Sequence, residues 1–239
     1  MSTWLVTGGS RGIGRAVVDH VAASGDRVAS LARSSSAEPA AHPDRVLEVK
    51  ADVADGASVR DGLRTVQEAF GSVDVIVNSA GVHRGGRVES LDREAWDEVV
   101  STNLTGAFEV CRAAVPVLSA GASIVNVGAV VGWRGFPGDV AYGSAKAGLS
   151  GLTQVLAVEL APRGVRVNLV VPGFVDTDMT AGLSERARAR VIGTIPAGRT
   201  GTAQEIAEVI VAVARSTYMT GATVPVDGGL LASFGGHMR

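Results

Sequence analysis

Tyr142 and Lys146 are the residues whose types and spacing most directly suggest chemistry in this chain. Four residues make about one turn of a helix, so the two side chains are expected on the same helix face. An ammonium group beside a phenol favours the phenolate and lowers a pKa that is about 10 in an unperturbed tyrosine. Lys146 is also one of only two lysines, with Lys50, among 22 basic residues. The pair therefore suggests a tyrosine that exchanges a proton with a substrate oxygen at neutral pH.

A glycine-rich turn near the start of the chain, residues 7–14 (the glycine turn), suggests where a nucleotide would bind. Its glycines follow an apolar segment and open an amphipathic one, so they are expected at a strand-to-helix junction. Missing side chains let backbone N–H groups approach a pyrophosphate at the positive end of a helix. The spacing is G-x-x-x-G-x-G rather than the common G-x-G-x-x-G. Together with the Tyr142–Lys146 pair, the glycine turn predicts redox chemistry on a nicotinamide cofactor.

The residues after the second expected strand indicate which nicotinamide cofactor is used. An acidic residue there would hold the ribose 2′-hydroxyl of NAD. This chain has Arg33 near that point and Arg11 inside the glycine turn. Two guanidinium groups suit the additional phosphate of NADP(H), unless both are solvated surface arginines. Asp52 follows the third strand, where it either meets an adenine amino group or caps a turn.

Bulk properties favour one α/β domain over residues 1–239. A formal charge of −2 without blocks of like charge argues against nucleic acid as a partner. No apolar run reaches the roughly 18 residues that a membrane span needs, and no basic segment typical of a signal peptide opens the chain. Cys111 is the only cysteine, which fits a buried apolar position and a reducing cytoplasm. No metal site is expected.

Short apolar runs alternate with amphipathic segments, a pattern typical of repeated βα units and a mostly parallel sheet. Strands are expected at 3–7, 27–32, 46–49, 73–77, 122–127, 165–171 and 223–226. Helices are expected at about 12–24, 56–70, 92–119, 141–161 and 203–215, with a shorter helical insertion at roughly 177–193. The expected fold class is an α/β, single-domain Rossmann-like doubly wound sheet of about seven parallel strands flanked by helices.

In this order, the motifs resemble the classical short-chain dehydrogenases/reductases along nearly the whole chain. Within that family the chain is most similar to 3-oxoacyl-(acyl-carrier-protein) reductases and polyketide ketoreductases. The matching segments are the glycine turn, 78–81, 103–106, 142–146, 172–179 and 225–229.

The resemblance implies a role for each matching residue. Tyr142 would be the general acid in reduction, Lys146 would hold the nicotinamide ribose and lower the tyrosine pKa, and Asn103 would kink its helix and position a water. Thr177 would contact the nicotinamide carboxamide, cap the following helix, or do both. The implied cofactor site consists of Gly8, Ser10, Arg11, Gly12, Ile13, Gly14, Arg33, Asp52, Val53, Asn78, Ala80, Gly81, Tyr142, Lys146, Pro172, Gly173, Val175 and Thr177.

One residue departs from the family pattern. The family carries a serine 13 residues before the tyrosine, whose hydroxyl donates to the substrate carbonyl, and this chain has Ala129 there. Loss of one such donor typically costs about 100- to 1,000-fold in turnover. Three interpretations stay open: an engineered serine-to-alanine change, a natural alanine in an enzyme that works slowly or borrows a hydroxyl from its substrate, and a non-catalytic NADP(H)-binding subunit. The intact Asn103, Tyr142 and Lys146 argue against the last.

The expected reaction is NADPH-dependent reduction of a β-ketoacyl or polyketide-type carbonyl to a hydroxyl, on a free chain or on an acyl carrier protein. A secondary-alcohol dehydrogenase acting on another small ketone or alcohol is the alternative enzyme. Trp133 and Phe136 either wall an apolar acyl pocket or cover the core.

The resemblance also concerns mobility and assembly. Segment 177–193 resembles the mobile lid of the family. Its positive face, suited to an acidic carrier protein or simply to water, is formed by Arg186, Arg188 and Arg190. A homotetramer is the expected assembly.

Overall fold

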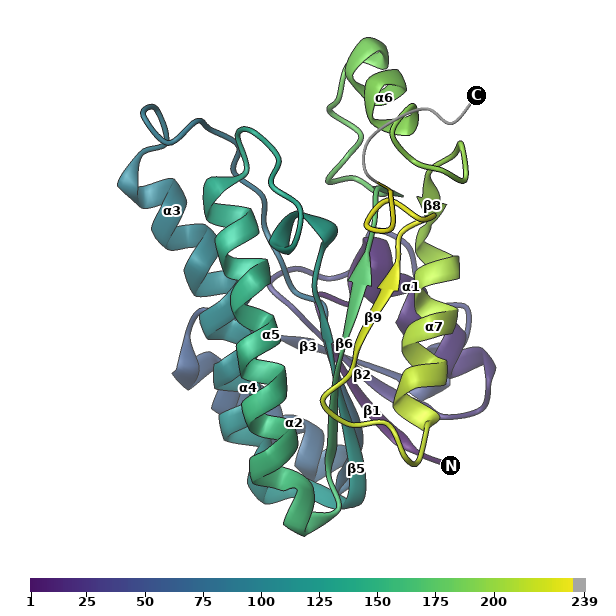
Figure 1. The fold of residues 1–239 in the computed structure, drawn as a ribbon. Helices are drawn as coiled ribbons and strands as arrows, with labels where there is room; N and C mark the ends of the chain where they lie inside the picture. Colours follow the sequence, from purple (N-terminus) through teal and green to yellow (C-terminus); the bar gives the residue numbers. More distant parts are fainter. Residues whose placement is uncertain (234–239) are drawn as a thin grey trace.

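The computed structural model describes residues 1–233, so residues 234–239 of the expected domain lie outside the described part. A parallel sheet lies between two layers of helices (Figure 1). Its seven strands follow the order β3-β2-β1-β4-β5-β6-β9, and neighbouring strands all run parallel. This arrangement confirms the predicted fold class. The strands are β1 (Thr3–Thr7), β2 (Arg27–Ala32), β3 (Val46–Lys50), β4 (Val73–Asn78), β5 (Leu118–Val127), β6 (Arg166–Pro172) and β9 (Thr223–Val226).

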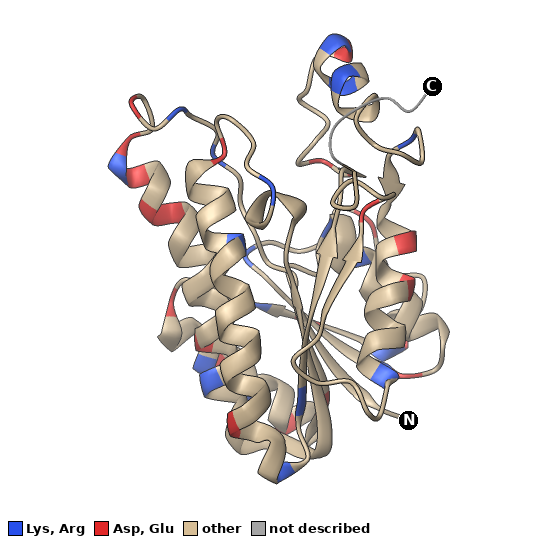
Figure 2. Ribbon diagram, in the orientation of Figure 1, with Lys and Arg blue, Asp and Glu red and all other residues tan. Residues whose placement is uncertain are grey.

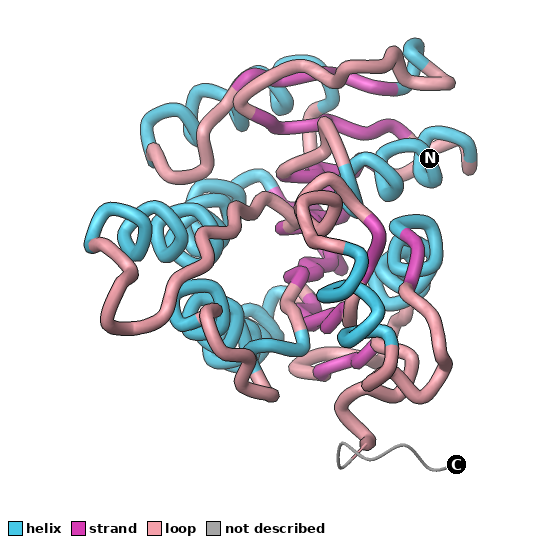
Figure 3. The backbone as a smooth tube through the Cα atoms, turned by 90° about the horizontal axis from the view of Figure 1, so that it is seen from above, coloured by secondary structure: helices cyan, strands magenta, loops and turns pink. Residues whose placement is uncertain are grey.

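The sheet is covered on both faces, as the views in Figures 1 and 3 show. Helices α1 (Gly12–Ala23) and α7 (Ala203–Arg215) cover one face, and α2 (Gly56–Phe70), α4 (Gly106–Ala114) and α5 (Val140–Leu160) cover the other. Alternate residues of one strand therefore enter different cores. Trp4 and Val6 pack with α1 and α7, whereas Leu5 packs with the opposite layer. Burial on both faces explains the nearly continuous apolar strands, and these predicted most strand boundaries to within one residue.

The single helix predicted at 92–119 is wrong. The segment contains α3 (Arg93–Val100), a π-helical turn at Ser101–Thr105, α4, and a short 3-10 helix at Val115–Val117. The π turn contains Asn103, whose side-chain amide binds the backbone of Val82 in both directions, at 2.8 and 2.9 Å. Pro116 lies in the 3-10 helix, and its missing N–H and fixed φ end the helical run. An amphipathic pattern shows neither the widened turn nor the tertiary bonds to Asn103.

Strand β5 begins at Leu118 rather than at 122, because it contains a bulge. Leu118 pairs with Val73, and the next pairing joins Ser123 to Val75, so the register shifts between them. Gly121 lies inside the bulge with a φ of +77°, a conformation that glycine adopts without strain. Residues 118 and 119, predicted as the end of a helix, are therefore part of the sheet.

The region after β6 contains more structure than was predicted. A two-stranded parallel sheet joins β7 (Val175–Asp176) to β8 (Gly201–Thr202). Helix α6 (Glu185–Ile192) is shorter than the insertion expected at 177–193. Short 3-10 helices also occur at Pro43–Arg45, Val130–Gly132 and Ala161–Arg163. Among residues 1–233, no helix is both long and apolar enough to cross a membrane.

Two helical glycines give a matched test of this packing. A Cβ on Gly14 would lie 2.3 Å from the carbonyl oxygen of Gly8, whereas a Cβ on the exposed Gly151 would meet nothing within 4 Å. We expect Gly14→Ala to lower the free energy of unfolding by about 1–3 kcal/mol through overpacking. Gly151→Ala should raise it by about 0.5–1 kcal/mol, because alanine has the higher helix propensity. Urea denaturation measures both, and equal effects would contradict the close approach at Gly14.

Candidate active site

The carboxyl ends of β1, β4, β5 and β6 meet at one edge of the sheet, and the site residues gather there. Thr7 ends β1, and its hydroxyl oxygen accepts from the N–H groups of Ser79 and Ala80, each at 3.1 Å. Gly8 has a φ of +69°, and a Cβ on it would lie 2.8 Å from the Cα of Ala80. The glycine turn is thus held directly against residues 78–81, and both are segments that the sequence assigned to the cofactor site.

The start of helix α1 is suited to an anion. Arg11 precedes the helix in an extended conformation, its side chain does not cap it, and the first turn contains no acidic residue. The N–H groups at this helix end, including that of Ile13, therefore face no competing carboxylate. Gly12 has a φ of +56°, and a Cβ built on it would lie 3.5 Å from a methyl group of Thr177. Thr177 is therefore placed over the glycine turn from a segment far along the chain.

Tyr142 and Lys146 lie on the same face of α5, with the lysine Nζ 5.6 Å from the centre of the tyrosine ring. Lys146 is buried and donates a hydrogen bond of 2.7 Å to the carbonyl oxygen of Val127, the last residue of β5. A Cβ on Gly81 would lie 3.9 Å from this Nζ and 3.4 Å from the side-chain oxygen of Asn103. The structure therefore brings Asn103, Tyr142 and Lys146 together beside residues 78–81.

The expected direction of the tyrosine pKa is wrong. Burial, and then the charge of Asp139, raise the pKa of Tyr142 above its ordinary value, although the residue as a whole is only half-buried. Burial lowers the pKa of Lys146 from 10.5 to about 8. Spacing alone predicts attraction between the two groups, but it does not show how far each is removed from water. A phenol in this environment keeps its proton at neutral pH and releases it less readily than an unperturbed tyrosine.

Ala129 lies just beyond the end of β5 and precedes the 3-10 helix at Val130–Gly132. It is 9% exposed and extended, with a φ of −163°. Its methyl group offers no donor to a substrate oxygen. Ser144, a nearby hydroxyl on α5, lines an open hollow of about 580 Å³ instead, together with Trp133 and Phe136. Tyr142 and Lys146 do not line that hollow, so the two aromatic residues do not form a pocket around them.

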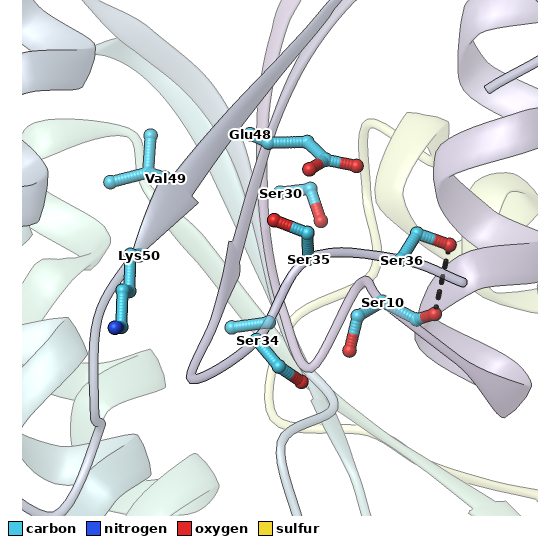
Figure 4. A pocket seen from close by; sticks show the side chains of 9 residues that line it. Ser10, Ser30, Ser34, Ser35, Ser36, Glu48, Val49 and Lys50 are labelled. Carbon is cyan, nitrogen blue, oxygen red and sulfur yellow. Dashed lines mark hydrogen bonds between the residues drawn. The ribbon is translucent and has the colours of Figure 1, made fainter. Parts of the chain in front are cut away.

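A small cavity of about 100 Å³ lies between the glycine turn and the loop after β2 (Figure 4). Hydroxyl groups dominate its lining, which consists of Ser10, Ser30, Ala32, Ser34, Ser35, Ser36, Glu48, Val49 and Lys50. Arg11 and Arg33 do not line this cavity but are exposed next to residues that do, and within residues 1–233 neither guanidinium has a hydrogen-bond partner. Both are free to meet an anion.

Arg15 is a residue of this region that the sequence did not reveal. Its guanidinium donates to the hydroxyl of Ser36 and to the carbonyl oxygens of Glu38 and Pro39, the latter two at 2.7 and 2.8 Å. The hydroxyl of Ser36 in turn donates to the carbonyl oxygen of Ser10 at 3.2 Å. Arg15 thus ties the loop after β2 to α1 and sets the shape of the cavity. Its position inside a helix gave no signal of this role.

The remaining predicted cofactor residues support the same edge of the sheet. Asp52 accepts from the N–H of Ala54 at 2.9 Å, which is the turn-capping alternative, and Val53 is buried against Gly106. Asn78 is buried and donates to Asn126 at 2.8 Å; Asn126 then donates to Thr153 of α5 at 2.9 Å. The sequence did not reveal this polar network, because its members are far apart along the chain.

Segment 172–177 enters the site from the end of β6. Pro172 and Val175 are buried, and the N–H of Gly173 donates to the carbonyl oxygen of Val226 at 3.0 Å. Thr177 does not cap the following helix, since Ser184 is the cap of α6 and accepts from Ala187. That alternative for Thr177 is therefore wrong.

The arginines of α6 are not equivalent. Figure 2 shows basic residues at this end of the molecule. Arg188 pairs with Asp176 and lies 5.9 Å from the centre of the Phe174 ring, whereas Arg186 and Arg190 are exposed. The positive face expected on segment 177–193 therefore consists of Arg186 and Arg190, because the charge of Arg188 is paired with Asp176.

Comparisons with known proteins agree on a family. A family model described as enoyl-(acyl carrier protein) reductase matches residues 8–231. The 3-oxoacyl-(acyl-carrier-protein) reductase FabG of Escherichia coli strain K12 is 40% identical over 233 residues, which is 95% of this chain and 96% of the relative. Carbonyl reductase family member 4 of Danio rerio is 42% identical over 231 residues, with 95% and 96% covered.

Solved structures lead to the same family. A mutant short-chain dehydrogenase/reductase of Serratia marcescens superposes with a TM-score of 0.90 at 34% identity, covering 96% of this chain and 97% of the other. A blue fluorescent protein from a metagenomic library, solved in complex with NADPH, gives a TM-score of 0.86 at 31% identity, with 96% and 97% covered.

The buried Lys146 predicts a pH dependence of stability. Its pKa falls from 10.5 to about 8 on folding, so between these pH values the unfolded chain binds the proton more tightly. The free energy of unfolding should therefore rise by about 1 kcal/mol between pH 8 and 9. As pH approaches and passes 9, the thiol of Cys111 opposes this rise, because burial raises its pKa from 9.0 to about 11, and the raised pKa of Tyr142 opposes it at still higher pH.

Urea denaturation at a series of pH values measures this effect. Lys146→Met should abolish the rise, whereas Lys50→Met, at the exposed second lysine, should retain it. A rise that survives in Lys146→Met would show that another group causes it.

Proposed function

This chain belongs to the short-chain dehydrogenase/reductase family and is an oxidoreductase, and from that premise we propose that it uses NADPH to reduce a β-ketoacyl carbonyl to a hydroxyl. The observation that carries the proposal is the convergence of Tyr142, Lys146 and Asn103 beside residues 78–81 at the strand ends. The relatives named as 3-oxoacyl-(acyl-carrier-protein) reductases support this substrate class.

The glycine turn fits a dinucleotide. Gly8 and Gly12 have positive φ values, and side chains there would fill the space against Ala80 and Thr177. The pyrophosphate would lie at the start of α1, against Gly8, Ser10, Arg11, Gly12, Ile13 and Gly14. The adenine end would meet Asp52, Val53 and Arg33, and the nicotinamide end would meet Asn78, Ala80, Gly81, Pro172, Gly173, Val175 and Thr177. When bound, NADPH supplies the hydride that reaches the carbonyl carbon.

The protein then provides the proton. Tyr142 donates from its hydroxyl group to the carbonyl oxygen, and its raised pKa keeps that proton in place until the oxygen gains charge. Lys146 holds the nicotinamide ribose and, in its charged form, stabilises the phenolate that remains. Asn103, fixed by Val82 in the π turn, supports the route by which Tyr142 regains a proton.

Because residue 129 is an alanine, this mechanism lacks one hydrogen-bond donor to the carbonyl oxygen of the substrate. In the leading proposal the enzyme is weakened at this position, whether the alanine is native or engineered. A non-catalytic NADP(H)-binding subunit is the second candidate, and Ala129 is the observation that favours it. A secondary-alcohol dehydrogenase would use the same residues in the opposite direction, with the phenolate as base.

Substrate delivery and assembly are part of the proposal. A carrier-bound substrate would approach Arg186 and Arg190, which remain exposed on α6, with segment 177–193 acting as a lid. A homotetramer would cover the exposed apolar side chains of α4 and α5, namely Phe108, Val155 and Val158.

Restoring the serine tests the role of position 129. We expect Ala129→Ser to raise the kcat of β-keto thioester reduction by at least about tenfold, because a hydroxyl then donates to the developing oxyanion. Ala129→Val is the control, since it changes the side chain without adding a donor. NADPH oxidation with acetoacetyl thioesters and bulkier ketones measures the rates. Equal rates in the alanine and serine forms would contradict the proposed vacancy, and inactivity of both with intact NADPH binding would favour the non-catalytic subunit.

Exchanging the arginine after β2 tests the cofactor preference. Arg33→Asp should weaken NADPH binding by about 10- to 100-fold without weakening NADH binding, because it removes a charge-assisted contact to the 2′-phosphate and places a carboxylate where it can hold the ribose 2′-hydroxyl. Fluorescence titration of both cofactors measures the preference. Arg190→Asp makes the same charge change on α6 and should not alter it. An unchanged preference in Arg33→Asp would exclude Arg33 as the phosphate ligand.

A further inference from the structure

His83 and Asp139 form a pair beside the proposed catalytic tyrosine. His83 follows β4 and Asp139 precedes α5, and the histidine Nε2 lies 2.8 Å from a carboxylate oxygen of Asp139. The two loops are also joined through their backbones, since Gly86 donates to the carbonyl oxygen of Gly138 at 2.8 Å. The backbone bond therefore holds the loop after β4 against the loop before α5, and the His83–Asp139 pair lies between these two loops.

The carboxylate of Asp139 is directed to the histidine rather than to its own helix. Asp139 occupies the cap position of α5, where aspartate commonly accepts from helix N–H groups, yet its side chain makes no such bond. Its side chain is 17% exposed, compared with 35% for His83. The carboxylate of Asp139 is partly buried and binds the imidazole of His83 instead of the helix N–H groups, which indicates a specific pairing of the two residues.

His83 also contacts the tyrosine ring. The ring centres of His83 and Tyr142 are 5.2 Å apart, and their planes meet at 77°. This edge-to-face geometry is favourable for two aromatic rings and restricts the rotation of both. The histidine thus touches Tyr142 with its ring and Asp139 with its Nε2 atom.

Several charges lie near Tyr142, and of these the exposed Arg87 and Glu89 line the same hollow as Asp139. Asp139 disfavours the phenolate and contributes to the raised pKa of Tyr142, while Lys146 lies near the ring from within the same helix. On α3, which packs beside α5, Glu98 is paired with Arg84. In the loop before α5, Arg134 donates to the carbonyl oxygen of Leu230. Among the described residues, His83 is thus the side chain that binds the Asp139 carboxylate, whose negative charge acts on Tyr142.

We propose that His83, held by Asp139, is a positioning residue that fixes the Tyr142 ring and shields it from the Asp139 carboxylate. The functional meaning of this inference rests on the proposed role of Tyr142 as proton donor. An imidazole N–H that donates to the carboxylate neutralises part of its field at the phenol. His83 therefore acts on the acidity of Tyr142 through Asp139, and it has no effect on that acidity once the carboxylate is gone.

A direct titration of Tyr142 tests this coupling without any substrate. The chain has two tyrosines, and Tyr218 is fully exposed, so Tyr218→Phe leaves Tyr142 as the single tyrosine. Fluorotyrosine then gives one resonance, and the ring fluorine makes the phenol more acidic, which brings its titration toward pH values at which the protein stays folded. Fluorine NMR follows this resonance in four forms: the parent, His83→Phe, Asp139→Asn and the double variant. Phenylalanine keeps an aromatic ring at position 83 but removes the N–H donor.

The expected shifts have opposite signs. Asp139→Asn should lower the midpoint of the Tyr142 titration by at least about 0.5 pH unit, because it removes a negative charge, and His83→Phe should raise it by a similar amount, because it exposes that charge. His83→Phe should cause no shift in the Asp139→Asn background. His83→Gln retains an N–H donor and should stay closer to the parent than His83→Phe. Circular dichroism and NADPH titration verify that each form is folded.

Two results would overturn the inference: an unchanged midpoint in His83→Phe, or an equal shift in both backgrounds. Either would show that His83 does not act through Asp139. The parent protein is assayed in parallel for ketone reduction with NADPH. If the parent protein does not reduce ketones, the proposed function is wrong, and the titration still shows whether His83 acts on Tyr142 through Asp139. If the parent protein is active but His83→Phe leaves the Tyr142 midpoint unchanged, only the inference about His83 is wrong.

Discussion

The burial of one cation constrains the whole site. Lys146 carries its amine into the protein between α5 and the end of β5, and its described partner is the carbonyl oxygen of Val127. Such burial is costly for a charged group, which is why its pKa falls to about 8. The position is maintained only if α5 is held tightly against the sheet. The buried bonds from Asn78 through Asn126 to Thr153 of α5 provide that attachment at the level of the central strands.

Segments whose side chains are buried within the two cores could be predicted from the sequence, whereas features that depend on distant contacts could not. Strands covered on both faces carry an apolar signal along their whole length, so β1, β2 and β9 were predicted with their observed bounds. The resemblance implied a kink at Asn103, but the apolar pattern predicted neither the π turn there nor the bulge at Gly121. Both depend on contacts with segments distant in sequence, namely Val82 and strand β4. Pro116 was a local signal for the end of the helix, and it was overlooked.

The site shows the same division. The glycine turn and the Tyr142–Lys146 pair are local patterns, and both lie where the sequence predicted them. The direction of the Tyr142 pKa was predicted incorrectly, because it depends on burial and on Asp139 rather than on spacing within a helix. Arg15 and His83 were overlooked for a related reason. Each acquires its role only through a tertiary partner, a loop carbonyl in one case and a carboxylate in the other.

These protonation states bear on the direction of catalysis. A phenol whose pKa is raised is protonated over the whole physiological range, so in the proposed reaction Tyr142 would begin as the proton donor. The same raised pKa makes it a weaker acid, and Ala129 adds no donor to stabilise the oxygen that must receive the proton. The charge of Lys146, whose pKa is near 8, then becomes the main factor that favours the phenolate product. In the proposed reaction the site depends on keeping that lysine charged, so reduction is expected to be faster toward lower pH, whereas the free energy of unfolding rises between pH 8 and 9.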